Sequence, residues 1–144
     1  YIEKQNYDQA NAMLDEAIVA DPTNAVYYNL KGVICESQKD NVAAADLYKK
    51  AVEIDPANAS ARYNYGRKLC EQAYAISDSS ANMSQAEYNK VRAEQIDPLL
   101  RQAAEHLEKA FELDEDNQRD ALRYLRNVYY NLGDEANLKR IELM

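Results

Sequence analysis

Apolar residues in the C-terminal stretch recur with the period of a helix that has one buried face. Leu122, Leu125, Val128 and Tyr129 share one helical register, and Gly133 follows them as a stop signal. Only three Gly and three Pro occur in 144 residues, so the composition favours helices over strands and turns. The sequence therefore predicts an all-α protein without a β-sheet.

Small and turn-forming residues recur at an interval of 34 residues. The first set is Ala10, Ala17, Pro22 and Asn24, and the second is Ala44, Ala51, Pro56 and Asn58. Asp-Pro closes both copies, and Leu14 falls opposite Tyr48. This interval indicates a helix hairpin that is repeated along the chain.

The repeated unit resembles the tetratricopeptide repeat, in which small residues lie where two helices touch and a proline ends the unit. Residues 25–58 carry the resemblance best, through Tyr28, Gly32, Ala44, Tyr48, Ala51 and Pro56. Lys31 and Cys35 depart from the pattern. The resemblance implies an α-solenoid of antiparallel helix pairs, wound into a right-handed superhelix with a concave groove. In each pair, small residues such as Gly32 allow a close approach, while Leu30 and Tyr48 fill the space between the helices.

A long insertion interrupts the third unit. Ala103, Ala110 and Asn117 follow their equivalents in the second unit by 59 residues instead of 34, an excess of 25. We place the insertion at about 74–98. Ser84 and Glu87 form a capping box, which predicts a helix from about Gln85. Asp97-Pro98 then begins another helix or kinks one long helix.

These boundaries divide the chain into a single domain of four repeats. We expect the second half of repeat 1 at 1–24, repeat 2 at 25–58, enlarged repeat 3 at 59–117 and an incomplete repeat 4 at 118–144.

Charge and chemistry narrow the range of functions. The net charge of -8 opposes binding to nucleic acid or anionic lipid and makes a basic peptide the easier partner. No apolar stretch approaches the length of a membrane span.

Phosphate loops and nucleophile motifs are missing, and His106, the only histidine, is expected at a surface or interface. Cys35 and Cys70 lack zinc-ligand spacing. We predict free cysteines and a non-enzyme without metal or cofactor.

The resemblance also implies where a ligand binds, because first helices line the groove in this family. The corresponding positions are Asn29, Val33 and Glu36 in the second unit, Tyr63, Arg67 and Cys70 in the third, and Arg123, Asn127 and Tyr130 in the fourth. Tyr63 and Tyr130 offer amphipathic surfaces, and Arg67 and Arg123 can grip a carboxylate in a forked geometry. Cys70 is expected to face the groove, and Cys35 to be a small buried residue.

The leading hypothesis is a non-catalytic scaffold that binds a peptide or helical segment of another protein in the groove. One alternative is a glycan-binding or envelope-assembly module that stacks sugars on Tyr63 and Tyr130. Another is a structural homo-oligomer, such as a homodimer, that forms through the inserted helix.

The segment from Ala59 onward resembles the C-terminal part of secreted or envelope-associated bacterial tetratricopeptide proteins, which favours a periplasmic location. Because the chain opens at Tyr1 within a helical pattern, we also expect an upstream part.

Overall fold

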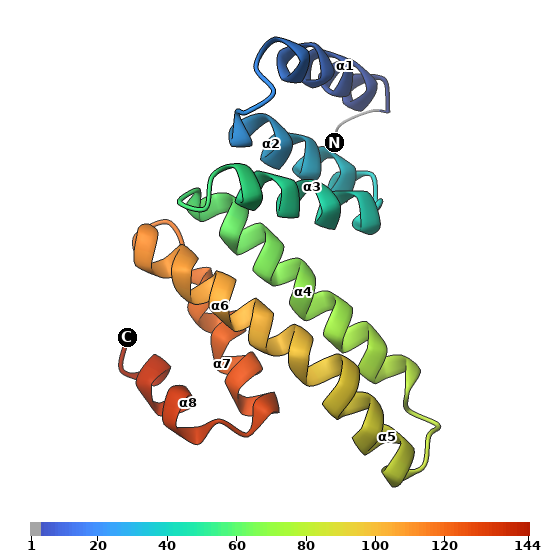
Figure 1. Cartoon of the computed structure of the whole chain (residues 1–144), viewed down its shortest axis with the longest axis vertical. Helices are drawn as coiled ribbons and strands as arrows, with labels where there is room; N and C mark the ends of the chain where they lie inside the picture. Colours follow the sequence, from blue (N-terminus) through green and yellow to red (C-terminus); the bar gives the residue numbers. More distant parts are fainter. Residues whose placement is uncertain (1–3) are drawn as a thin grey trace.

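The computed structural model describes residues 4–144, and within them every regular element is helical (Figure 1). Helices α1 to α4 follow one another along the long axis of the molecule, α5 lies at its far end, and α6 runs back beside α4. They are α1 (Lys4–Ala20), α2 (Ala25–Ser37), α3 (Asn41–Ile54), α4 (Ala59–Ser79), α5 (Gln85–Val91), a π-helical turn (Arg92–Ile96), α6 (Asp97–Leu113), α7 (Asp120–Leu132) and α8 (Glu135–Glu142). The prediction of an all-α solenoid of antiparallel helix pairs is confirmed.

Residues that recur in the sequence also begin the helices. The side chains of Asn24 and Asn58 accept hydrogen bonds from the backbone N–H groups of Val26 and Ala61 at the starts of α2 and α4. Asn117, the third asparagine at this repeat position, instead donates two hydrogen bonds to the carboxylate of Asp114. Helix α7 therefore begins at Asp120, two residues later than the spacing alone suggests.

Close helix approach depends on two glycines. A Cβ at Gly32 would lie 2.6 Å from Cε1 of Tyr48, and a Cβ at Gly66 would lie 2.8 Å from Cγ of Leu107. Tyr48 is fully buried, as predicted, but Leu30 is 46% exposed. The expectation that Leu30 fills the space between helices was wrong, because nearly half of its surface is open to solvent.

The insertion lengthens both helices of the third hairpin. Helix α4 has 21 residues against 13 in α2, and α5 begins at Gln85 with the predicted capping box of Ser84 and Glu87. Helices α5 and α6 continue one line beside α4 (Figure 1). The π-helical turn joins them.

Pro98 accounts for this turn. It has no N–H to donate to the preceding turn, and its ring crowds the carbonyl four residues earlier. The π-helical turn gives the backbone a wider path, in which the N–H of Asp97 bonds to the carbonyl of Arg92. The two alternatives for Asp97-Pro98 thus resolve into one long helix with a local widening.

The largest core lies between α4, α6, α7 and α8, with Leu100, Leu107, Leu125 and Val128 at its centre. A smaller cluster of Ala25, Ala51, Val52 and Ala61 joins α2, α3 and α4. Within residues 4–144, none of the helices has the length and apolar character required to cross a bilayer.

Candidate interaction face

Helix α4 lies between α2 and α7 and contacts both. We call the surface formed by these three first helices the first-helix face. At the α2–α4 junction, the amide nitrogen of Asn29 donates to Oγ of Ser60 at 3.1 Å. Asn64 donates in turn to Oδ1 of Asn29 at 3.0 Å. Asn29 is therefore buried and used inside the protein, which makes it a residue that joins helices.

Glu36 is the centre of an ionic network at the same junction. Arg67 donates to both of its carboxylate oxygens, at 2.5 and 2.7 Å, and Nζ of Lys68 lies 2.8 Å from Oε2. The hydroxyl of Tyr48 donates to Oε1 at 2.8 Å. The hydrogen bonds from Arg67 are the main reason that the pKa of Glu36 falls to about 2.

Arg67 thus has the forked geometry expected from its residue type. Its carboxylate partner, however, is Glu36 of the same chain. In this structure both terminal nitrogens of Arg67 donate to an internal carboxylate, and this pairing joins α4 to α2.

Aromatic rings occupy the α4–α7 junction. The rings of Tyr63 and Tyr124 meet edge to face, with their centroids 6.0 Å apart. Arg67 lies 5.9 Å from the centre of the Tyr63 ring, and Arg123 lies 5.5 Å from that of Tyr124. Burial raises the pKa of Tyr63. This tyrosine is half-buried between helices, so it offers less surface for stacking than its sequence position suggested.

Cys70 was expected to face the groove, and the structure contradicts this. Its side chain is fully buried, in the core cluster that contains Ile96 and Leu100. Burial raises the pKa of its thiol to about 12. The equivalent position in the second unit, Glu36, lies at the end of α2, whereas Cys70 lies in the middle of the lengthened α4. The insertion therefore brings covering residues over a position that is open in the shorter repeat.

Cys35, in contrast, is half-buried and not the fully buried residue that was expected. Burial also raises the pKa of its thiol. Both cysteines are free, as predicted, and neither environment favours the reactive thiolate.

The exposed part of the first-helix face lies at its two sides. Val33 on α2 is 42% exposed, and Tyr130 on α7 is 74% exposed; Arg123 and Asn127 are exposed beside Tyr130. Val26 and Leu30 were not among the predicted groove residues, yet they are 50% and 46% exposed and precede Val33 by seven and three residues. Together these three residues form one apolar stripe on α2. The helical spacing was visible in the sequence, but a stripe of this kind is more often part of a core.

Models of the tetratricopeptide repeat match residues 1–59 and residues 47–87. These matches agree with the hairpin stacking and the close contacts at Gly32 and Gly66. The chain is a tetratricopeptide repeat protein. Proteins of this family are generally scaffolds for protein interactions and generally non-catalytic.

A curated relative is the type IV pilus assembly protein PilF of Pseudomonas aeruginosa, which is 32% identical over 72 residues. The match covers 50% of this chain and 29% of the relative. A solved structure from a functional characterisation of Pseudomonas aeruginosa PilF is also similar. The match covers 96% of this chain and 67% of the PilF chain, at 23% sequence identity and a TM-score of 0.43. The match to the crystal structure of MamA covers 98% of this chain and 91% of the MamA chain, at 19% sequence identity and a TM-score of 0.43.

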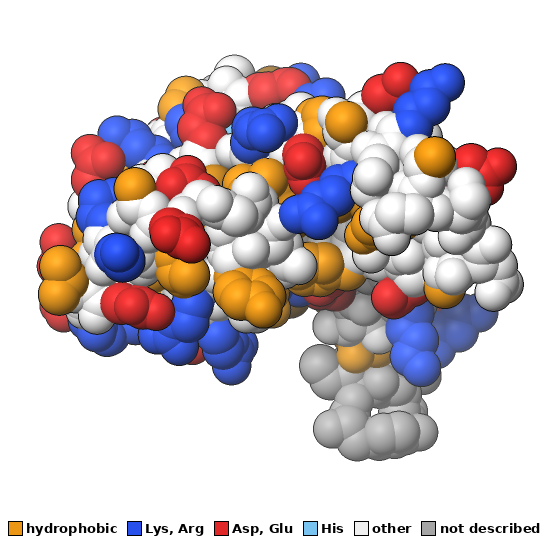
Figure 2. Space-filling model, turned by 90° about the horizontal axis from the view of Figure 1, so that it is seen from below, with side chains coloured by type: hydrophobic (Ala, Val, Ile, Leu, Met, Phe, Trp, Pro, Cys, Tyr) orange, Lys and Arg blue, Asp and Glu red, His pale blue; other side chains and the backbone are white. Residues whose placement is uncertain are grey.

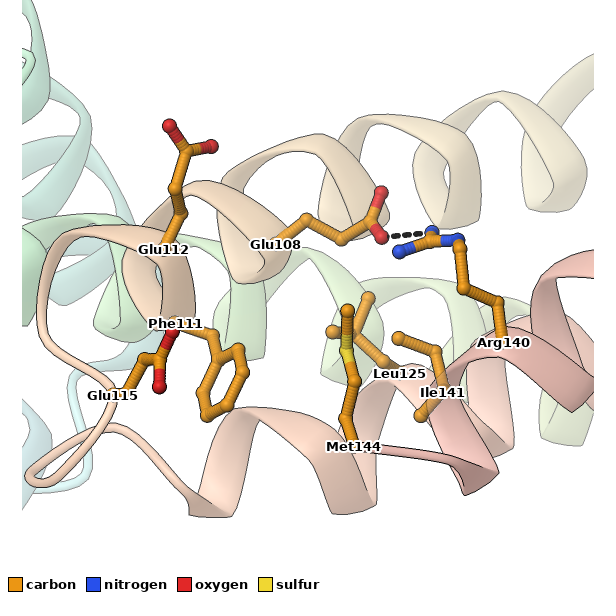
Figure 3. A pocket seen from close by; sticks show the side chains of 8 residues that line it. All are labelled: Glu108, Phe111, Glu112, Glu115, Leu125, Arg140, Ile141 and Met144. Atoms are coloured by element: carbon orange, nitrogen blue, oxygen red, sulfur yellow. Dashed lines mark hydrogen bonds and ion pairs between the residues drawn. The ribbon is translucent and has the colours of Figure 1, made fainter.

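The repeat protein also has a hollow of about 400 Å³ between α6, α7 and α8 (Figure 3). Phe111, Leu125, Ile141 and Met144 supply apolar surface, and Glu108 forms an ion pair with Arg140 at the rim. Figure 3 shows the side chains of Glu112 and Glu115 away from this pair, at the opposite end of the hollow. The lining comes from α6, from α8 and from the buried side of α7 through Leu125, so the hollow is separate from the exposed side chains of the first-helix face.

His106 lies where α4 and α6 meet, as the expectation of an interface histidine suggested. Its Nδ1 is 3.0 Å from Nη1 of Arg62, and its ring meets that of Tyr65 edge to face. Burial lowers the pKa of His106. Among the residues that the structure describes, no group of His, Cys, Asp and Glu side chains is arranged to hold a metal ion.

Proposed function

We propose that the first-helix face binds an extended or helical segment of another protein. The observation that carries this proposal is the pair of exposed surfaces on either side of α4. On α2 the apolar stripe of Val26, Leu30 and Val33 is exposed, and on α7 Tyr130 and Arg123 are exposed. Apolar, aromatic and arginine side chains are the types that contribute most to protein interfaces.

The residues that join the three helices of this face support binding indirectly. Asn29, Glu36 and Arg67 join α2 to α4, and Tyr63 joins α4 to α7 through Tyr124. A face whose helices are held in register before a partner arrives loses less conformational entropy on binding. We therefore assign these residues to positioning, and we assign contact with the partner to Val26, Leu30, Val33, Arg123, Asn127 and Tyr130.

The two alternatives from the sequence have weaker support. Sugar stacking needs an exposed ring face, but Tyr63 is half-buried and packs against Tyr124. Self-association through the insertion needs exposed apolar surface. Among residues 74–98, all of which the structure describes, Met83 is the only large apolar residue that is more than a third exposed.

The test is affinity capture from extracts of the source cell with a variant that leaves the junctions intact. Leu30→Ser, Val33→Ser and Tyr130→Ala change only exposed side chains of the first-helix face. A matched control carries Val19→Ser, Val42→Ser and Met83→Ser, which are exposed apolar residues elsewhere. We expect a protein that is retained by the parent and the control but lost by the first variant. Equal retention by all three proteins would contradict the proposal.

A further inference from the structure

Helix α7 and Arg119, the residue directly before it, present a stripe of basic and aromatic side chains to solvent. Arg119, Arg123, Arg126 and Tyr130 are all exposed, and their spacings of four, three and four residues place them on one face of a helix. The opposite face is the buried one, with Leu122, Leu125 and Val128 among its members. We call these four residues the arginine stripe.

Within residues 4–144 the three guanidinium groups have no carboxylate partner, and only Arg123 contacts a ring, that of Tyr124, with its Cζ 5.5 Å from the ring centroid. Over this part of the chain, no carboxylate lies at ion-pair distance from Arg119, Arg123 or Arg126, and none of the three donates a side-chain hydrogen bond. Arg67 and Lys68, in contrast, are both paired with Glu36. Cations at the α2–α4 junction are thus neutralised, whereas those of α7 are available to another molecule.

This stripe runs against the charge of the whole chain. The protein carries 25 acidic and 17 basic residues, a net charge of -8. Figure 2 shows acidic and basic side chains interspersed on the end of the molecule that it presents. Between residues 119 and 133, however, three arginines accompany a single acidic residue, Asp120, so this segment itself carries a net positive charge. Acidic residues flank it at both ends, at Asp114, Glu115 and Asp116 and at Asp134 and Glu135.

The contrast between local and overall charge selects the class of partner. A long polyanion, such as nucleic acid or an anionic membrane, extends beyond the stripe and is repelled by the acidic remainder of the protein. A short acidic peptide segment fits within the stripe, because screening by salt limits its interaction to charges within about 10 Å. Arginine also pairs with carboxylates in a bidentate geometry.

We propose that the arginine stripe binds an acidic segment of the partner protein, with Asp or Glu side chains opposite Arg119, Arg123 and Arg126 and an apolar or aromatic residue against Tyr130. This inference rests on the proposed function, since it names the chemistry of the segment that the first-helix face binds. It also reverses the preference for a basic peptide that the net charge alone suggested.

The experiment is selection of random 16-residue peptides displayed on phage, followed by fluorescence anisotropy with the labelled consensus peptide. The variant R119E/R123E/R126E reverses the three charges. The control K49E/K50E/K90E makes the same change in net charge at exposed lysines of α3 and α5. Circular dichroism checks that all proteins have the same helix content. A 16-residue oligothymidylate and phosphatidylserine vesicles serve as the polyanion probes.

We expect acidic peptides from the selection, with binding roughly tenfold or more weaker in R119E/R123E/R126E, unchanged in K49E/K50E/K90E and weakened by added salt. Peptides without carboxylates that bind both charge variants equally, but are lost in the Leu30, Val33 and Tyr130 variant, would overturn this inference and leave the proposed function standing. Oligothymidylate or vesicles that bind the stripe as tightly as the peptide would also overturn it. Selection of no peptide at all would count against both proposals.

Discussion

The two junctions of the first-helix face use the same repeat positions with different chemistry. Asn29 and Tyr63 are 34 residues apart, as are Glu36 and Cys70. At the α2–α4 junction Asn29 accepts a hydrogen bond from Asn64, whereas at the α4–α7 junction Tyr63 meets the ring of Tyr124. Glu36 is the centre of an ionic network, whereas its equivalent Cys70 is buried in an apolar core. The repeat thus fixes which positions meet, and the residue types decide how they are held.

This difference predicts different responses to mutation, pH and solvent. The polar junction depends on a balance of charges, because Lys68 is only 3% exposed and has carboxylate partners in Glu36 and Glu71. The aromatic junction depends on shape and on the exclusion of water.

The largest effect is expected for Glu36→Gln. The neutral amide removes the charge opposite Arg67 and Lys68. Breaking a fully buried ion pair from one side typically costs 3–5 kcal/mol, and the pair of Glu36 with Arg67 is partly buried. Because Lys68 keeps Glu71, we expect a loss of about 3 kcal/mol in the free energy of unfolding, measured by urea denaturation. The triple variant Glu36→Leu, Arg67→Met and Lys68→Met should recover most of this loss. A change below about 0.5 kcal/mol for Glu36→Gln would show that the network is solvated and weak.

Acid should weaken the same junction without mutation. The pKa of Glu36 is lowered from its usual 4.5 to about 2, chiefly by the hydrogen bonds from Arg67. A carboxyl group with a lowered folded-state pKa stabilises the protein at a pH above its unfolded value, and this contribution is lost as pH falls toward the folded value. We therefore expect the melting temperature to fall between about pH 4.5 and pH 2. The fall should be smaller in Glu36→Gln, and identical profiles in the two proteins would contradict this assignment.

An intermediate effect is expected for Cys70→Ser in the core cluster that contains Ile96 and Leu100. The substitution adds a hydroxyl group to a fully buried site, and a buried hydroxyl without a partner costs about 1–3 kcal/mol. Cys35→Ser is the matched control, because Cys35 is half-buried and separate from this core. Urea denaturation should show a loss of about 2 kcal/mol for Cys70→Ser and less than about 0.5 kcal/mol for Cys35→Ser. Equal losses would mean that burial of Cys70 has no energetic consequence.

The features that sequence reasoning predicted correctly are local ones. The side chain of Ser84 caps its own helix, and Gly133 ends α7 in the left-handed conformation (φ 71°), in which it has no Cβ to clash. The residues that recur at 34-residue intervals likewise reflect contacts within one hairpin, such as that of Gly32 with Tyr48. Signals of this kind lie within a few turns of the residues they affect.

The features that it missed depend on contacts between repeats. Nothing near Arg67 in sequence shows that Glu36, 31 residues away, occupies its guanidinium. The burial of Cys70 depends on the insertion, which lengthens α4 and brings Ile96 and Leu100 into the same core. Helical spacing alone does not say which face of α2 meets a neighbour. The expectation that Leu30 lies between helices was wrong for this reason. Repeat position predicts the neighbour, and the residue at the neighbouring position decides whether a side chain is free to bind.

The smallest effect that we predict concerns the aromatic pair of the α4–α7 junction. Edge-to-face pairs contribute about 0.5–1.5 kcal/mol beyond the area that they bury. A double-mutant cycle with Tyr63→Leu and Tyr124→Leu should give a coupling energy of about 1 kcal/mol by urea denaturation, insensitive to salt. The cycle with Tyr28→Leu and Tyr124→Leu is the control, because Tyr28 lies on α2, which does not contact α7, and its coupling energy should be close to zero. Arg67 and Arg123 lie over the two rings. A salt-dependent coupling of Tyr63 to Tyr124 would therefore mean that these arginines hold the junction electrostatically. The α4–α7 and α2–α4 junctions would then differ only in how much each depends on charge.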